Sequence, residues 1–419
     1  MARSFDKAGM SSSNVPPPPT EPVGLWLIGA RGGVAACSIF GMLLLRRNAA
    51  PPTGLVTALP EFQKTGLIPL DRVVVGGHEI RAASLTDEIR AFHRTNRVFS
   101  SDWIHLLESE LIECDRRIRW GTVSGASPAI AELASADVPR DASPWEAVQR
   151  LRADITAFRQ EHGLRHVVVV NVASTEPPAD PARYPSSWGE MEKALAGGDL
   201  SPPPSTLYAV AALSEGCSYV NFTPSLGASL PALTELAEIR HTRHMGCDGK
   251  TGETLMKSVL APMYRARNLE VLSWVGHNIF GNLDGRVLDD PQHKATKVRS
   301  KDHLVGDILG YSPKTVVSIE YVKDMGDWKT AWDHIHFSGF LGTPMVLQFI
   351  WQGCDSLLAA PLVLDLFRLT ERADRAGIRG TMPFLAPFFK SPYGVAENDF
   401  FLQHRALLDW VASLSQSDG

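Results

Sequence analysis

The chain has 419 residues, of which 44 % are hydrophobic and 21 % charged, so it is long enough for two globular domains. Its formal net charge of −5 excludes a general nucleic-acid binder, and its five scattered cysteines form no CxxC pair. We therefore expect a cytoplasmic protein of a reducing compartment, acting on neither nucleic acid nor membrane.

The first 45 residues predict a disordered lead followed by a strand, a turn and a helix. Residues 1–20 are polar and rich in proline and serine, and they lack the apolar core of a signal peptide. Val23–Ile28 is a continuous apolar run, typical of a parallel strand covered on both faces. Val34–Leu45 has the pattern of a helix. Arg31 and nearby glycines interrupt the apolar stretch, which favours a buried strand–turn–helix over a membrane span.

The turn between this strand and helix is a candidate cofactor site. A strand, a glycine turn and a helix in that order are the setting of a dinucleotide fingerprint. The spacing departs from GxGxxG, because Arg31 stands where the second glycine would be, so an ordinary strand-to-helix turn remains the alternative. The candidate residues are Gly29, Arg31, Gly32, Gly33 and Val34.

Two later strands end in polar residues. Val73–Val75 leads to Glu79, whose carboxylate could accept hydrogen bonds from a ribose diol, although an insertion at 51–71 must separate it from the glycines. A strand over 166–172 ends in three further candidates, for which a helix cap is the alternative. These are Ala173, Ser174 and Thr175. Helices are expected over 84–119, 144–162, 184–196, 205–214 and 230–239, and a short strand ends at 219–221.

The segment Gly246–Leu260 combines charged residues, threonines and glycines before a helical stretch. Such a helix start favours an anion, through free N–H groups and the positive end of the dipole. A nucleotide-binding P-loop would need a glycine where His244 stands, and a plain loop-to-helix cap is a second alternative. The candidate residues are Asp248, Lys250, Thr251, Gly252, Glu253 and Thr254.

The pattern then changes to strands separated by polar loops, expected over 270–275, 315–321 and 337–350. Helical patterns return over 357–376 and 403–414. We therefore expect a Rossmann-type doubly wound α/β domain, 21–245 plus 352–419, with an inserted α+β domain, 246–351, for catalysis and oligomerisation.

Polar residues in this second half could carry chemistry. Lysines on separate loops could converge on a phosphate or an oxyanion, although solvation at the surface would explain any one of them. They are Lys301, Lys329 and Lys390. Asn278, Asn282 and Asp284 add amide and carboxylate groups in what could be a plain turn, and Asp355 could simply cap a helix. His241, His244 and Cys247 suit zinc by type, but no fourth ligand is evident and we predict no metal.

These segments together resemble the myo-inositol-1-phosphate synthase family. The family's GDD-x-KSGQT-x-x-KS segment is matched by Gly246–Thr254 with Lys257 and Ser258, and its N-x-x-G-N-N-D-G segment by Asn278–Gly285. Further blocks match in the same order, from about residue 23 to the C-terminus. They lie at 76–80, 172–176, 204–211, 299–301, 326–329, 355–359 and 389–392.

The resemblance implies a tightly held NAD that is reduced and re-oxidised in each turnover, and a homotetramer built through the α+β region. Glucose 6-phosphate would become 1D-myo-inositol 3-phosphate by oxidation, enolisation, aldol closure and reduction. Lys301 and Lys390 would stabilise oxyanions and move protons, with Lys329 near both phosphate and reacting oxygen. Asp248 and Asp355 would hold the nicotinamide half, and residues 251–254 the phosphate.

Two departures bear on the substrate. A family lysine is replaced by Val305, and the glutamine of the phosphate turn is Glu253. If both positions face the phosphate, glucose 6-phosphate should bind weakly, and Val305→Lys with Glu253→Gln should tighten binding. The alternatives are cyclisation of another sugar phosphate, such as fructose 6-phosphate, and a non-catalytic NAD-binding homologue.

Overall fold

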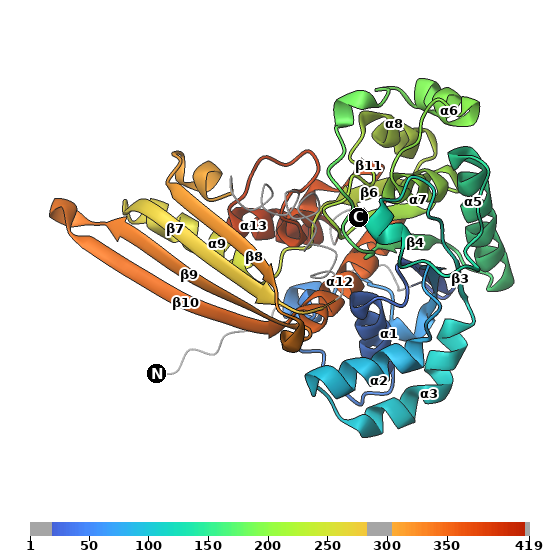
Figure 1. Ribbon diagram of the computed structural model, residues 1–419, viewed down its shortest axis with the longest axis horizontal. Helices are drawn as coiled ribbons and strands as arrows, with labels where there is room; N and C mark the ends of the chain where they lie inside the picture. Colours follow the sequence, from blue (N-terminus) through green and yellow to red (C-terminus); the bar gives the residue numbers. More distant parts are fainter. Residues whose placement is uncertain (1–18, 283–303, 415–419) are drawn as a thin grey trace, which may run out of the picture.

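The computed structural model describes residues 19–282 and 304–414, which form two β-sheets with helices packed against each (Figure 1). The larger sheet has seven parallel strands in the order β11-β6-β5-β4-β1-β2-β3. Its strands are β1 (Val23–Ile28), β2 (Val73–Glu79), β3 (Ile118–Trp120), β4 (Val167–Asn171), β5 (Ser218–Asn221), β6 (Arg243–Gly246) and β11 (Gly380–Thr381). The chain runs outward from β1 in both directions, so this sheet is doubly wound and has its switch point beside β1.

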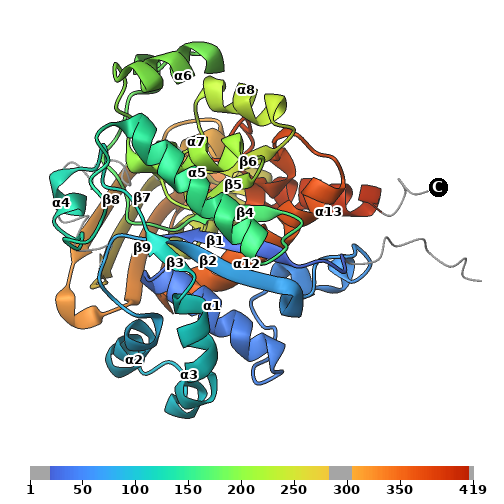
Figure 2. The same ribbon diagram turned by 90° about the vertical axis from the view of Figure 1, so that its right-hand side faces the viewer.

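Helices cover both faces of this sheet (Figures 1 and 2). Alternate side chains of β1 divide between two cores, because Leu25 and Leu27 join one cluster while Trp26 and Ile28 join the other. The first core lies under α1 (Gly33–Arg46), α2 (Leu85–Asn96), α3 (Ser101–Asp115) and α12 (Asp355–Arg375). The second lies under α5 (Pro144–Glu161), α6 (Trp188–Gly197), α7 (Pro204–Ser214) and α8 (Pro231–Ile239). The short α4 spans Pro128–Ala131, and α13 (Phe400–Leu414) packs beside the 3-10 turn Pro383–Phe388.

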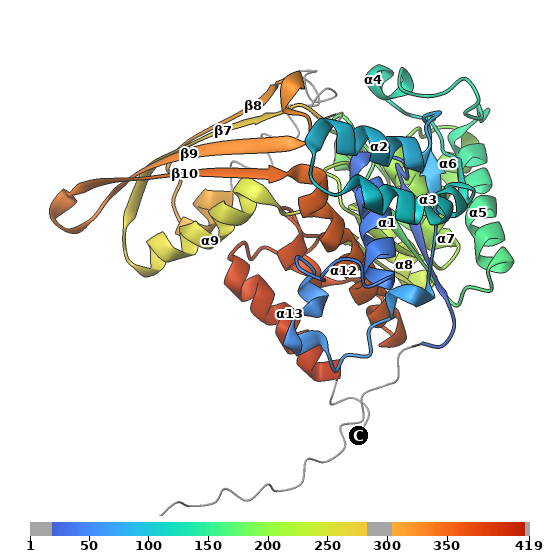
Figure 3. The ribbon, with the colours of Figure 1, turned by 90° about the horizontal axis from the view of Figure 1, so that it is seen from below.

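The smaller sheet projects from this body (Figures 1 and 3). Its strands, in the order β10-β9-β7-β8, are β7 (Glu270–Phe280), β8 (Lys314–Tyr321), β9 (Trp328–Ser338) and β10 (Pro344–Cys354). Helix α9 (Gly252–Ala266) lies along one face, where Tyr264 packs into a core with Trp274 and Ile335. On the other face Val346 and Ile350 are 53 % and 70 % exposed.

The predicted α/β fold with a doubly wound sheet is confirmed, and several element bounds are corrected. The strand expected over 337–350 is the end of β9, a turn at Phe340–Gly342, and most of β10. The helical stretch expected over 84–119 is two helices and the start of β3, and β6 was not anticipated. The insertion at 51–71 forms three short 3-10 turns.

The domain bounds stay a prediction, and residues 1–18 of the predicted lead lie outside the described residues. Within residues 19–282 and 304–414, no helix has both the length and the apolar character needed to cross a bilayer.

Candidate active site

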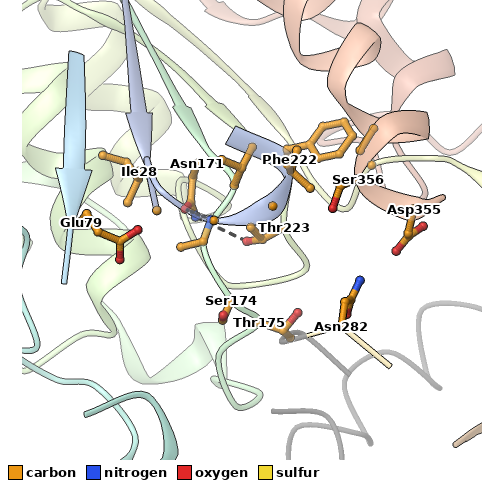
Figure 4. A pocket seen from close by; sticks show the side chains of 18 of the residues that line it. Ile28, Glu79, Asn171, Ser174, Thr175, Phe222, Thr223, Asn282, Asp355 and Ser356 are labelled. Atoms are coloured by element: carbon orange, nitrogen blue, oxygen red, sulfur yellow. Dashed lines mark hydrogen bonds between the residues drawn. The ribbon is translucent and has the colours of Figure 1, made fainter. Parts of the chain in front are cut away.

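A cavity of about 510 Å³ lies at the carboxyl ends of β1, β2, β4 and β5 and extends to the starts of β9 and α12. This is where an open α/β sheet places its ligands. In Figure 4, Glu79 stands on one side of the cavity, Asp355 and Ser356 stand on the other, and Ser174 and Thr175 lie between them. The predicted residues that line it are Gly29, Gly32, Gly33, Val34, Glu79, Ala173, Ser174, Thr175, Asp248, Thr251, Asn282, Lys329, Asp355 and Lys390.

The glycine turn allows three backbone segments to approach closely. Gly29 has a φ of +77°, and a Cβ there would lie 2.8 Å from the Cα of Ala173. A Cβ on Gly33, the first residue of α1, would lie 2.7 Å from the Oγ of Ser356. The N-termini of α1 and α12 therefore meet at the cavity, and both helix dipoles favour negative charge there.

The Glu79 carboxylate, which is nearly buried, ties the end of β2 to the glycine turn. Its oxygens accept hydrogen bonds from the backbone N–H groups of Arg31 (2.9 Å), Ile80 (2.8 Å) and Arg81 (3.1 Å). The Arg81 guanidinium adds a long contact of 3.4 Å. The Arg31 side chain does not line the cavity, because its Nε donates to Asp115 at 2.8 Å. A ribose diol would have to replace the long Arg81 contact, since a carboxylate offers about four acceptor positions.

Two lysine–carboxylate pairs line the opposite side of the cavity. Lys390 Nζ lies 2.8 Å from Asp248 Oδ1, and both side chains are nearly buried. Lys329 Nζ lies 3.5 Å from both carboxylate oxygens of Asp355 and 5.1 Å from the ring centroid of Phe280. Each pair joins two distant segments of the chain, so the cavity holds two ammonium groups supported by carboxylates.

Asp327, which was not predicted, organises the second of these pairs. Its carboxylate accepts from the Ser356 backbone N–H (2.6 Å) and hydroxyl (2.9 Å), from Asn282 Nδ2 (2.9 Å) and from Cys354 Sγ (3.1 Å). It therefore caps α12 from another segment. Burial, and secondarily the Asp355 carboxylate, raises the pKa of Asp327. The match to the family block at 326–329 draws attention to this segment. The cap itself could not be predicted, because it depends on the position of α12 relative to Asp327.

Other unpredicted residues also line the cavity. Thr223 follows β5 and interacts with Asn171 at the end of β4, through a hydrogen bond of 3.4 Å from Asn171 Nδ2 to Thr223 Oγ1 (Figure 4). Phe222 and Arg81 lie at the ends of β5 and β2. The rule that ligand contacts follow the carboxyl ends of parallel strands points to all three positions.

Several predicted residues lie away from the cavity. Lys250 Nζ donates to Gln403 Oε1 of α13 at 2.5 Å, and burial lowers its pKa to about 8. Glu253 is buried and contacts Lys257 Nζ and Asn278 Nδ2, each at 2.6 Å. Gly252 and Thr254 belong to the first turn of α9. Lys301 and Asp284 lie outside the described residues.

The prediction that position 305 faces the substrate phosphate is wrong. The Val305 side chain is fully buried in the apolar core with Tyr264, Trp274 and Ile335, so a lysine there would bury an ammonium group. Glu253 already offsets the charge of Lys257. The double change Val305→Lys with Glu253→Gln would therefore damage this core, and we no longer expect it to tighten phosphate binding.

Comparison with known proteins assigns the family. The model of the family described as myo-inositol-1-phosphate synthase matches residues 23–412, nearly the whole chain. The chain belongs to the myo-inositol-1-phosphate synthase family. The name of the matching model also denotes NAD binding.

Individual members of the myo-inositol-1-phosphate synthase family are similar to this chain in sequence and in structure. Inositol-3-phosphate synthase 1 of Bacteroides thetaiotaomicron is 32 % identical over 93 % of this chain and 94 % of its own. The crystal structure of inositol-3-phosphate synthase from Caenorhabditis elegans superposes with a TM-score of 0.85 at 24 % identity, covering 96 % of this chain and 87 % of its own. A myo-inositol-1-phosphate synthase-related protein from Thermotoga maritima gives 0.76 at 24 % identity, covering 94 % and 99 %. The similarity to the two crystal structures concerns the fold alone. The similarity to the Bacteroides enzyme supports the conclusion that this chain is an enzyme.

Proposed function

We propose that this protein is an NAD-dependent isomerase that converts glucose 6-phosphate to 1D-myo-inositol 3-phosphate. The observation that carries the proposal is the pair of lysine–carboxylate contacts, Lys390–Asp248 and Lys329–Asp355, across one cavity from a glycine turn. A non-catalytic homologue would have no need of two ammonium groups held at a ligand cavity. Membership of the family supplies the substrate class.

The cavity suits a dinucleotide. The glycines that a Cβ would obstruct, Gly29 and Gly33, lie where a pyrophosphate would meet the N-terminus of α1. Glu79 would hold the adenosine ribose, while Asp248 and Asp355 would lie at the nicotinamide half. When bound, NAD supplies an acceptor for hydride from C5 of the sugar and returns that hydride at the end of turnover.

The lysines suit the carbon chemistry. Removal of a proton from C6 and attack of C6 on the C1 aldehyde both develop negative charge on oxygen. Fixed ammonium groups in a site shielded from water stabilise such charge. Lys390 and Lys329 would have this role, with Asp248 and Asp355 holding them in place. Lys301 stays a prediction for the same chemistry.

The substrate phosphate would bind at the first turn of α9, near Thr251 and Lys329. Thr251 and Lys329 line the cavity, and Thr251 is the N-cap residue of α9. A helix of 15 residues presents free N–H groups and a positive dipole end at this point. Lys250 is excluded from this role by its contact with α13.

A product assay tests the function. Purified protein with NAD is incubated with glucose 6-phosphate, and inositol phosphate is measured by chromatography and mass spectrometry. We expect inositol phosphate with no net change in NADH. A parallel incubation with fructose 6-phosphate tests the alternative substrate. A carbocyclic product from fructose 6-phosphate and none from glucose 6-phosphate would show that the alternative is correct. No carbocyclic product from either substrate would favour the non-catalytic alternative.

We also propose a cytoplasmic homotetramer. The face of the smaller sheet that α9 leaves uncovered carries Val346 and Ile350, and the nearby turn exposes Phe340 and Leu341 at 87 % each. Exposed apolar patches of this kind mark association surfaces, and a symmetric partner is the commonest solution. All five cysteines are free, which supports a reducing location.

A further inference from the structure

The end of the cavity beside Glu79 has the composition of an adenosine subsite. Ile80, which follows Glu79, lines the cavity together with Ile130 and Leu133. The segment that carries the last two is joined to the end of β2, because the Ser135 backbone N–H donates to the Ile80 carbonyl oxygen at 2.7 Å. Apolar side chains next to a carboxylate at the end of this strand suit an adenine ring and its ribose. We therefore place the adenosine half of the proposed NAD at this end.

A guanidinium group stands where NADP-dependent enzymes hold the additional phosphate of their cofactor. Arg81 follows Glu79 by two residues and lines the cavity. In dinucleotide-binding folds, an arginine near this carboxylate position accommodates the phosphate on the 2′-oxygen of the adenosine ribose. Arg81 by itself would therefore favour NADP over NAD.

The Arg81 guanidinium is nevertheless already bonded on both of its terminal nitrogens. Its Nη2 donates to the Arg31 carbonyl oxygen at 2.6 Å and lies 3.4 Å from Glu79 Oε2, and its Nη1 lies 3.2 Å from Glu88 Oε1. Glu88 belongs to α2 and also lines the cavity. When a ribose diol replaces the long contact, Glu88 and the Arg31 carbonyl still hold the guanidinium. One positive charge thus stands between two carboxylates, and a phosphate on the ribose would add negative charge to a net negative group.

The N-terminus of α2 does not compensate for this negative charge. The Leu85 N–H donates to Asp115 Oδ1 at 3.2 Å, and the Asp87 N–H donates to Ser84 Oγ at 3.1 Å. Asp115 also accepts from the Arg31 side chain, which is thereby directed away from the cavity. Two N–H groups of the first turn and a second guanidinium are therefore already engaged with acceptors of the protein itself.

We propose that Glu88 is a specificity-determining residue that makes the site select NAD over NADP. Glu88 does so by holding the Arg81 guanidinium and by adding a second carboxylate beside Glu79. The 2′-hydroxyl of NAD needs neither the guanidinium nor a positive potential, whereas a 2′-phosphate needs both. The inference rests on the proposed function, because it names the residue that selects the cofactor of that reaction.

Competition between the two dinucleotides tests this proposal on the whole protein. The purified protein is incubated to equilibrium with equal concentrations of NAD and NADP and freed of unbound dinucleotide by gel filtration. It is then denatured, and the released NAD and NADP are quantified by chromatography. Native protein should release NAD almost exclusively. In Glu88→Gln, which keeps the size of the side chain and removes its charge, the ratio of NADP to NAD should rise about tenfold or more.

Glu108→Gln is the matched control. Glu108 is also held by an arginine, since Arg90 Nη2 lies 2.5 Å from its Oε1, but it does not line the cavity. The change in net charge is the same as in Glu88→Gln, so the control variant should keep the native ratio. A rise of the same size in Glu108→Gln would overturn the proposal, because the effect would then come from net charge alone.

A double variant tests the part that Arg81 has in this selection. Glu88→Gln with Arg81→Gln lacks the guanidinium that the phosphate would use, so the ratio of NADP to NAD should return towards the native value. A ratio that stays high would overturn the role of Arg81. Retained NAD with an unchanged ratio in Glu88→Gln would overturn the inference and leave the proposed function standing. Native protein that releases neither dinucleotide would refute NAD dependence and this inference with it.

Discussion

Lys390 and Asp248 form a contact that is nearly buried on both sides, so its two partners affect stability as well as chemistry. Lys390→Met should remove the buried ammonium partner of Asp248 and lower the free energy of unfolding by about 3–5 kcal/mol. It should also reduce kcat by about a hundredfold or more through loss of an oxyanion partner. Urea unfolding and the product assay measure the two effects.

The double variant Lys390→Met with Asp248→Asn separates them. Removing the Asp248 charge as well should recover part of the lost stability, whereas the activity should stay low. Activity that returns together with stability would show that Lys390 has only a structural role.

Glu176 gives a residue-scale dependence on pH. Burial raises the pKa of Glu176 to about 7. The hydrogen bonds that its carboxylate accepts from the Ser205 N–H and hydroxyl lower the pKa and offset part of this rise. The unfolded chain releases this proton near pH 4.5, so between about pH 4.5 and 7 the folded state binds more protons. The contribution of this group to stability therefore falls as pH rises through that window and is constant above it.

Glu176→Gln removes this titration and keeps an acceptor for the Ser205 donors. Relative to native protein, the variant should gain stability as the pH is raised from 5 to 8. Urea unfolding at both pH values checks this. Equal differences at the two pH values would mean that Glu176 does not titrate in this range.

At the scale of elements, the close approach of α1 and α12 makes Gly33 sensitive to substitution. Gly33→Leu should push Ser356 away and abolish NAD retention, because a Cβ there already lies 2.7 Å from the Ser356 hydroxyl. Gly41→Leu on the same helix is the control, since a Cβ at Gly41 has nothing within 4 Å. NAD released on denaturation is quantified in both. Full NAD content in a folded Gly33→Leu variant would remove the glycine turn from the cofactor site.

The Asp327 cap should position α12 for catalysis. Asp327→Asn would turn an amide donor toward donors on Ser356, so the Asp355–Lys329 pair should shift and kcat should fall about tenfold or more. Asp324→Asn, at an exposed position in the preceding turn, is the control. The pH profile of kcat should move in Asp327→Asn alone, and an unmoved profile with normal kcat would contradict this role.

Sequence patterns predicted the elements whose structure is decided by the chemistry of a few consecutive residues. The strand Val23–Ile28 and the glycines after it could be placed because a continuous apolar run and a glycine turn are signals carried by a few consecutive residues. The β9–β10 hairpin was missed although Gly339 and Gly342 mark its turn, because Phe340 and Leu341 between them make the stretch look like one continuous apolar strand. In the site, the direction of Lys250 depends on Gln403 of α13, which no local pattern reveals.

At the scale of the whole molecule, the uncovered face of the smaller sheet should control assembly. Val346→Lys with Ile350→Lys places two charges at positions 53 % and 70 % exposed, so the monomer should remain folded while association weakens. Light scattering after size exclusion should show a tetramer for native protein and smaller species for the variant. Phe401→Lys, at an exposed position on α13, is the control. A native protein that is monomeric at micromolar concentration would exclude this interface.

The pairing of α1 with α12 has a consequence for synthesis on the ribosome. Helix α1 (Gly33–Arg46) emerges early, but α12 (Asp355–Arg375), which packs against it in the first core, emerges only after the smaller sheet has been made. The apolar face of α1 that packs against α12 therefore stays exposed to solvent during synthesis. A nascent chain that stalls after β6 keeps this face exposed. Such chains are natural clients for chaperones that bind apolar surface, and the complete seven-stranded sheet can form only near the end of translation.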